Sequence, residues 1–181
     1  MLILASASPR RHELLLAAGL PHIVQAASVP EYLTPGELPV DFVRRLARDK
    51  ARAIASDGGD VVLGADTIVC LESQIFGKPV DDRDAFRMLE FLSGREHWVH
   101  TGICLRSKKG EIVDVSSTKV YFAELSKEEI EGYIRSGEPR DKAGAYAIQG
   151  LASKFITSIE GCYQNVVGLP VSLVYHHMKT L

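Results

Sequence analysis

The chain has 181 residues, of which 46% are hydrophobic, and this predicts one domain with an ample core. Its formal net charge of −2 excludes the basic surface of proteins that bind long nucleic acids, so any bound anion is expected to be small and held locally. There is no charged-then-apolar leader and no apolar run of about 18 residues. Three widely spaced cysteines, Cys70, Cys104 and Cys162, form no zinc or disulfide pattern. We therefore expect a soluble, cytoplasmic protein without a nucleic-acid or membrane partner.

The chain opens with a pattern of strand, tight turn and helix. Met1–Ala5 is an apolar run typical of a short buried strand, Ser8 suits a helix N-cap, and Pro9 suits the first helical position. The free amides and the dipole of such a helix start attract anions. Arg10 and Arg11 lie in the first turn, where the dipole disfavours cations unless an anion is bound. A solvated helix start with two incidental arginines is the alternative.

The remaining elements follow from hydrophobic periodicity and turn residues. The first helix is expected to stop at Gly19, and a turn-rich loop at 30–39 precedes the next one. Further helices are predicted at 40–55, at 82–92, from a Ser126/Glu129 capping box to Gly137, and from about Pro170; strands are predicted at 61–71, 97–105, 112–122, 154–159 and 164–167. Alternating strands and helices with an antiparallel stretch predict an α/β fold on a mixed sheet.

Two charged side chains fall where the pattern predicts burial. Asp66 interrupts the apolar run 61–71, where an unpaired carboxylate is costly, so it lies near the strand end or pairs with a cation or metal. A structural aspartate that caps a neighbouring turn is the alternative. Lys50 shares a helix face with Val43 and Ala47, where it either binds an anion or extends past apolar neighbours to solvent.

Two later segments offer further polar groups. Lys78 lies in Gly77-Lys78-Pro79, which by itself indicates only a turn. Residues 138–150 are rich in small side chains that let the backbone approach a ligand, and Gln149 carries both a donor and an acceptor. Composition alone predicts that this segment is a loop and a strand with a polar end.

Taken in order, these segments resemble one family. The chain carries SASPRR at 6–11, LARDKA at 46–51, GADTIV at 64–69, GKP at 77–79 and DKAGAYAIQG at 141–150, and the set resembles the Maf family of nucleoside triphosphate pyrophosphatases. The resemblance continues to Gly168-Leu169-Pro170, so it covers essentially the whole chain as a single domain, 1–181. It implies an inosine-triphosphatase-like α/β architecture, a mixed twisted sheet flanked by helices with two lobes around a central cleft, and a homodimer. It also implies cleavage between the α- and β-phosphates assisted by a divalent metal, Mg²⁺ or Mn²⁺.

The resemblance also assigns roles to individual positions. It implies that Asp66 is the proton acceptor, and the remaining implied roles are substrate selection by Arg11, Thr67 and Gln149, phosphate binding by Ser8, Arg10, Lys50 and Lys78, and metal binding by Glu31 and Asp66. Whether Asp66 acts as base, metal ligand or both stays open. One departure is Pro30, where family members often have a second acid, so Glu31 is the sole carboxylate there.

The segment at 141–150 also indicates a branch of the family. Asp141-Lys142-Ala143-Gly144 and Gln149-Gly150 resemble the branch that acts on dTTP and UTP, whereas the branch that prefers methylated guanine nucleotides tends to carry Glu before the last glycine. We therefore expect hydrolysis of dTTP and UTP, or of modified pyrimidine nucleotides, to the monophosphate and diphosphate. The alternatives are a nucleotide-sensing module linked to cell division, a scaffold with incidental polar clusters, and a phosphatase with Asp66 as covalent nucleophile. The last is disfavoured because residue 68 is Ile, which breaks the Asp-x-Asp signature.

Overall fold

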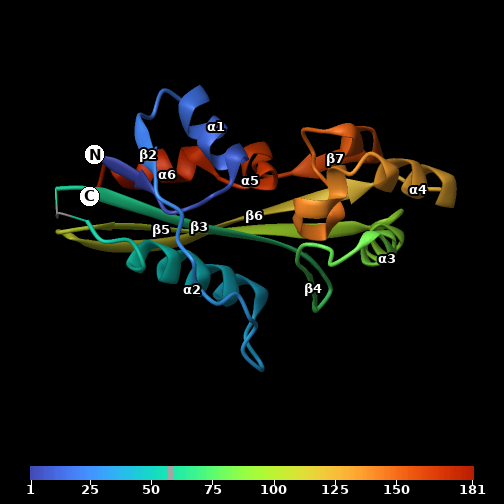
Figure 1. Cartoon of the computed structure of the whole chain (residues 1–181), viewed down its shortest axis with the longest axis horizontal. Coiled ribbons are helices and arrows are strands. Elements are labelled where there is room, and N and C mark those ends of the chain that lie inside the picture. Colours follow the sequence, from blue (N-terminus) through green and yellow to red (C-terminus); the bar gives the residue numbers. More distant parts are fainter. Residues whose placement is uncertain (57–58) are drawn as a thin grey trace. The chain divides into compact units, whose positions relative to one another are not determined.

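The computed structural model describes residues 1–56 and 59–181 and shows an α/β fold on a mixed sheet (Figure 1). The seven strands lie in the order β2-β1-β3-β5-β6-β7, with β4 paired to β3. β1 is parallel to β2 and β3, whereas β4 is antiparallel to β3 and β7 is antiparallel to β6. The predicted α/β class and mixed sheet are thus confirmed.

The bounds of the elements are as follows. The strands are β1 (Leu2–Leu4), β2 (His22–Val24), β3 (Val61–Leu71), β4 (Gln74–Phe76), β5 (Glu96–Ser107), β6 (Gly110–Phe122) and β7 (Ile156–Glu160). The α-helices are α1 (Pro9–Ala17), α2 (Pro39–Arg52), α3 (Asp82–Leu92), α4 (Lys127–Arg135), α5 (Tyr163–Val167) and α6 (Val171–Met178). Short 3₁₀ helices are η1 (Glu138–Asp141), η2 (Ala143–Ala145) and η3 (Leu151–Phe155). None of the helices in the described ranges is long and apolar enough to cross a membrane.

The chain forms two compact units, each built from separate segments. The first unit contains Met1–Thr67, His100–Ser116 and Gly168–Leu181, and the second contains Ile68–Val99 and Ser117–Val167. β3, β5 and β6 each contribute residues to both units.

In the first unit, different helices cover the two faces of the sheet. Successive residues of a strand point to opposite faces, so leucines of β1 and β3 pack with α1 and α6 in one cluster. The neighbouring Ile3 and Val62 pack with Ala47 and Ala51 of α2 in another. Figure 1 shows α1 and α6 on one side of β1 and β3 and α2 on the other.

α2 approaches the sheet closely because two strand residues have no side chain. A Cβ atom at Gly64 of β3 would overlap the Ala47 carbonyl and lie 2.7 Å from the amide nitrogen of Ala51. A Cβ atom at Gly102 of β5 would likewise overlap the backbone of Val43. Glycine at both positions therefore sets the distance between α2 and the strands beneath it.

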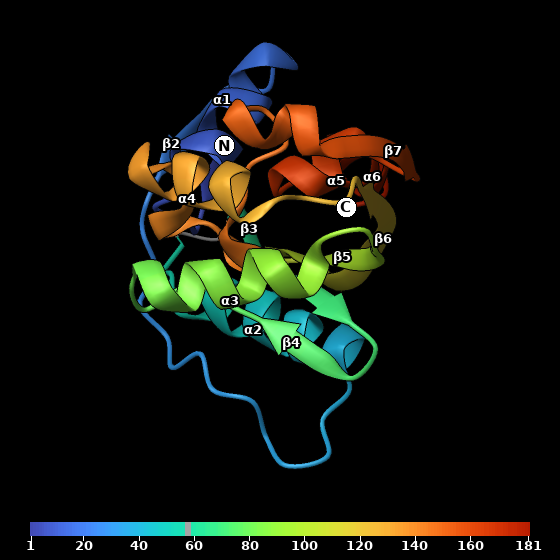
Figure 2. The ribbon, with the colours of Figure 1, turned by 90° about the vertical axis from the view of Figure 1, so that its right-hand side faces the viewer.

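In the second unit, α3 and α4 lie next to each other and enclose one core with the ends of the long strands (Figure 2). Leu89 and Leu92 of α3 pack in this core with Ile130 of α4 and Phe122 of β6. α3 begins at Asp81, whose side chain accepts from the Asp84 amide, and α4 begins at the predicted Ser126/Glu129 capping box.

Most predicted elements are present, and two predictions are wrong. Residues 164–167 lie in helix α5 and do not form a strand. The buried side chain of Asn165 donates hydrogen bonds to the Val99 carbonyl at 3.0 Å and to Thr118 Oγ1 at 2.9 Å. These contacts hold the segment in place without hydrogen bonds to a neighbouring strand. Residues 138–150 contain 3₁₀ turns and no strand, because Gly144 adopts a φ of 68° that extended backbone does not allow. The three-residue strands β2 and β4 were not predicted, since so short a run shows no periodicity.

Gly64→Ala is expected to destabilise the protein by about 2–3 kcal/mol, because the added methyl group meets helix backbone that cannot rotate away. Urea unfolding at equilibrium measures this free energy. Gly132→Ala is the matched control, since its methyl group would lie on an exposed turn of α4 and is expected to stabilise by about 0.5–1 kcal/mol. An unfolding midpoint unchanged by Gly64→Ala would contradict the proposed packing constraint.

Candidate active site

The centre of the candidate site is an ammonium group held between two carboxylates in the first unit. Lys50 Nζ of α2 lies 2.6 Å from Asp66 Oδ1 of β3 and 2.6 Å from Glu31 Oε1 of the loop before α2. Lys50 and Asp66 are only 8% and 7% exposed, whereas the Glu31 side chain is 54% exposed. Lys50 is therefore buried and ion-paired rather than extended to solvent, and Asp66 is paired with a cation in the middle of its strand. Phosphate binding by Lys50 stays a prediction.

Burial shapes the electrostatics of this group. It raises the pKa of the Asp66 carboxyl above its ordinary value, and the positive charges of Lys50 and Arg11 oppose the rise. Burial also lowers the pKa of the Arg11 guanidinium, which stays protonated at neutral pH. A carboxylate with a raised pKa is better suited to accept a proton than an ordinary surface aspartate.

Arg11 connects three parts of the first unit. Its Nε donates to the Gly168 carbonyl at 2.8 Å, and one terminal nitrogen donates to Ser6 Oγ and to the Ala65 carbonyl, both at 3.0 Å. The other terminal nitrogen donates to Thr67 Oγ1 at 3.0 Å. The guanidinium thus connects the turn before α1 to β3 on both sides of Asp66. All four of these hydrogen bonds are to groups of the protein itself. Base selection by Arg11 and Thr67 stays a prediction.

The start of α1 lies in the same unit. Ser8 occupies the predicted N-cap position, but its side chain makes no capping hydrogen bond; its amide donates to Ser6 Oγ at 3.2 Å. Arg10 follows in the first turn, close enough for its charge to lower the pKa of Arg11, after the larger effect of burial. Ser8 and Arg10 therefore lie at the turn that Arg11 anchors, and phosphate binding by them stays a prediction.

A divalent metal would find two protein ligands here. Among residues 1–56 and 59–181 no three His, Cys, Asp or Glu side chains gather closely enough to hold an ion by themselves. Glu31 and Asp66 nevertheless place carboxylate oxygens around the same point, now taken by the Lys50 ammonium. Mg²⁺ is commonly bound by one or two carboxylates together with water and substrate phosphates, so this donor set fits such an ion.

Two predicted site residues, Lys78 and Gln149, lie in the second unit. Lys78 is exposed in the turn after β4, where the Gly77 carbonyl accepts from the Gly144 amide at 3.0 Å. Gln149 is exposed in the turn before η3, whose Leu151 amide donates to Glu138 Oε2 at 3.0 Å. Both side chains are accessible to a ligand, and their roles stay predictions.

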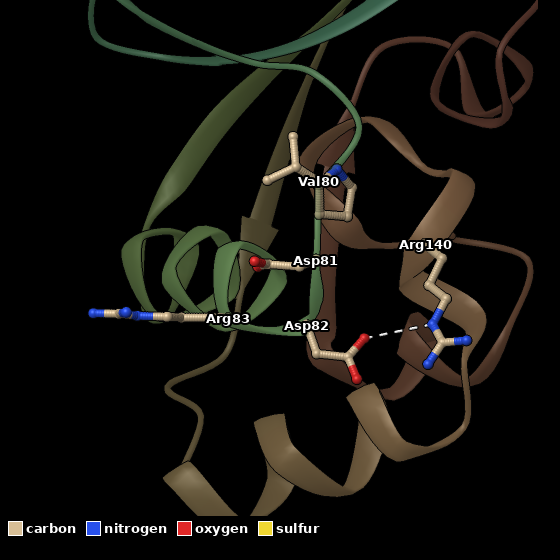
Figure 3. A pocket seen from close by; sticks show the side chains of 6 residues that line it. Val80, Asp81, Asp82, Arg83 and Arg140 are labelled. Carbon is tan, nitrogen blue, oxygen red and sulfur yellow. Dashed lines mark ion pairs between the residues drawn. The ribbon is translucent and has the colours of Figure 1, made fainter.

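A surface hollow of about 540 Å³ follows the turn that carries Lys78 (Figure 3). It is lined by Pro79, Val80, Asp81, Asp82, Arg83 and Arg140. Asp82 and Arg140 form an ion pair at 3.4 Å, and Arg83 points away from them. The lining includes no predicted site residue, although Pro79 directly follows Lys78 in the chain.

Sequence reasoning missed the groups that hold the site in place. They are Ser6, the Gly168 carbonyl, and Thr101, whose hydroxyl lies 2.9 Å from that of Thr67. It also missed Gly64 and Gly102. A glycine inside an apolar strand is a recognised sign of close backbone approach and could have predicted the position of α2.

Comparison with known proteins identifies the family of this chain. A family model described as Maf-like protein matches residues 1–181. A dTTP/UTP pyrophosphatase of Koribacter versatilis is 54% identical and covers 98% of this chain and 93% of its own length, and one of Geotalea uraniireducens is 52% identical, with 99% and 94% covered. Among solved structures, the nucleoside-triphosphatase (dITP/XTP pyrophosphatase) of Mycobacterium abscessus matches 98% of this chain and 93% of its own chain. The sequence identity is 11% and the TM-score is 0.41, so this likeness carries no argument about the activity. By its motifs, its family model and its relatives, this chain belongs to the Maf family.

Proposed function

We propose that the protein hydrolyses dTTP and UTP to the nucleoside monophosphate and diphosphate. The names of relatives about half identical over nearly the whole chain support this substrate class. The observation that carries the chemistry is the buried Asp66 carboxylate, held 2.6 Å from Lys50 beside the turn that begins α1.

The charge balance of the cluster suits a polyphosphate. Arg11 and Lys50 offset Asp66 and Glu31, so the group is formally neutral before substrate binds. The helix start and Arg10 add positive potential at its edge. A triphosphate would compete with the carboxylates for Lys50, which would free Asp66 to orient and deprotonate the attacking water. Phosphate binding by Lys78, whose side chain is exposed, is a further part of this proposal.

Glu31 and Asp66 are the residues that would hold Mg²⁺ or Mn²⁺. A divalent cation bound there would offset the charge of the phosphates and lower the pKa of a bound water molecule. The fit rests on their shared position around Lys50 Nζ.

We also propose that the protein is a cytoplasmic homodimer. The family resemblance supports the dimer. The three free cysteines, two of them buried, suit a reducing compartment.

A nucleotide panel with products separated by chromatography tests the activity. With Mg²⁺ or Mn²⁺ we expect dTTP and UTP to be cleaved to monophosphate and diphosphate, and removal of the metal by EDTA to abolish turnover. Release of inorganic phosphate with a nucleoside diphosphate would contradict the bond assignment, and preference for GTP derivatives would contradict the branch assignment. Binding without turnover at saturating metal would favour the nucleotide-sensing alternative.

Asp66→Asn is expected to lower kcat by ~10²–10⁴-fold, because the amide keeps the shape of the carboxylate but loses its charge and basicity. Thermal melting should show a folded protein, since Glu31 still pairs with Lys50. Asp41→Asn on the exposed face of α2 is the control and should leave kcat unchanged. Near-normal turnover by a folded Asp66→Asn protein would assign the proton acceptor to another residue.

Gln149→Ala should change selectivity rather than stability, because this side chain is exposed. If it pairs with the base edge, its loss should change the relative kcat/KM among dTTP, UTP, CTP and GTP by about 5–150-fold. An unchanged kcat/KM ratio in Gln149→Ala would remove this residue from substrate selection.

Arg11→Ala is expected to lower the free energy of unfolding, because it removes a buried donor from the Ala65 and Gly168 carbonyls. Urea unfolding at equilibrium measures this loss.

A further inference from the structure

The loop that carries Glu31 has little apolar packing of its own. It joins β2 to α2 and projects at the N-terminal end of that helix (Figures 1 and 2). Tyr32 is 71% exposed, Leu33 48% and Leu38 64%. Burial of these side chains therefore does not hold the loop, and its conformation depends on polar contacts.

One side chain, Arg45 of α2, supplies several of those contacts. Its Nε and one terminal nitrogen donate to the two oxygens of the Glu37 carboxylate, at 2.7 and 2.8 Å, and the same terminal nitrogen donates to the Tyr32 carbonyl at 3.0 Å. Glu37 in turn accepts from the Thr34 amide at 3.1 Å, and its own amide donates to the Thr34 carbonyl. A paired guanidinium and carboxylate fix each other in orientation as well as in distance.

These contacts bear on Glu31 because of where Arg45 lies on the helix. Arg45 and Lys50 are five residues apart on α2, which is roughly 7.5 Å along its axis. The loop thus contacts the helix at two points, through Glu31 on Lys50 and through Tyr32 and Glu37 on Arg45. The carbonyl held by Arg45 belongs to Tyr32, the residue after Glu31, so this hydrogen bond restrains the backbone next to Glu31.

We propose that Arg45 is a positioning residue, which holds the loop through Tyr32 and Glu37 so that Glu31 faces Lys50 and Asp66. The part of this role that concerns catalysis rests on the proposed function. Arg45 lowers the pKa of Glu37 to about 2, so the pair stays charged throughout the pH range of an assay near neutrality.

The hold on the loop can be measured without any activity. Chymotrypsin cleaves after exposed aromatic residues in segments that open, and Tyr32-Leu33 is such a site. Arg45→Met should raise the rate at which the fragment ending at Tyr32 appears, by about tenfold, as followed by mass spectrometry. Arg44→Met is the matched control. Arg44 is the neighbour of Arg45 on the helix, and among the ion pairs of the described residues it pairs only with the exposed Asp41, at 3.5 Å.

A double-mutant cycle tests whether Arg45 acts through Glu31. We expect Arg45→Met to lower kcat/KM for dTTP, and the double variant with Glu31→Gln to be no slower than Glu31→Gln alone, within about twofold. Arg45→Lys, which keeps the charge but loses the paired geometry, should give an intermediate value. Arg44→Met should match the wild type in kcat, KM and melting temperature.

The outcomes separate this proposal from the proposed function. Equal cleavage rates for Arg45→Met and the wild type would overturn the hold on the loop, whatever the activity. Faster cleavage with additive losses in the cycle would overturn the role through Glu31. A wild-type protein that binds dTTP and UTP without hydrolysing them would refute the proposed function and the catalytic part of the Arg45 role, while the cleavage rates would still decide whether Arg45 holds the loop.

Discussion

The close approach of α2 to the sheet is the constraint on which the candidate site depends. Gly64 and Gly102 leave no Cβ atom between the strands and the helix backbone, so Ala47 and Ala51 pack directly on the sheet. At this distance a lysine one turn along the helix reaches a carboxylate in the middle of β3. A bulkier strand residue would move the helix outward and separate the two charges. The packing of small side chains thus determines the electrostatics of the site.

The buried charges carry a cost that the fold has to offset. An isolated ammonium or carboxylate is strongly disfavoured away from water, but Lys50 lies between Asp66 and Glu31 and each charge has a partner. Replacing such a cluster with apolar side chains commonly leaves a protein as stable or more so. The cluster is therefore better explained by what it can bind than by stability, which is consistent with the proposed binding of a triphosphate.

Arg11 has a structural role that the family resemblance does not imply. The family resemblance assigns it to substrate selection, whereas the structure uses its guanidinium to join the Ser6 turn, the Ala65 and Thr67 positions of β3 and the Gly168 carbonyl. The sequence shows that an arginine lies in the first turn of the helix, and this is compatible with both roles. It does not show which carbonyl groups surround the guanidinium. The four hydrogen bonds establish the structural role, whereas substrate selection by Arg11 stays a prediction.

The sequence by itself determined the α/β class, the bounds of β3 and α3, the capping box of α4 and the burial of Lys50, because each depends on periodicity or on residues a few positions apart. Its motifs also determined the family. Only the tertiary structure decided that Lys50 pairs with both Asp66 and Glu31, and that residues 164–167 form a helix. These outcomes depend on contacts between residues distant in the chain, such as Asn165 with Val99, and local propensity contains no information about such partners.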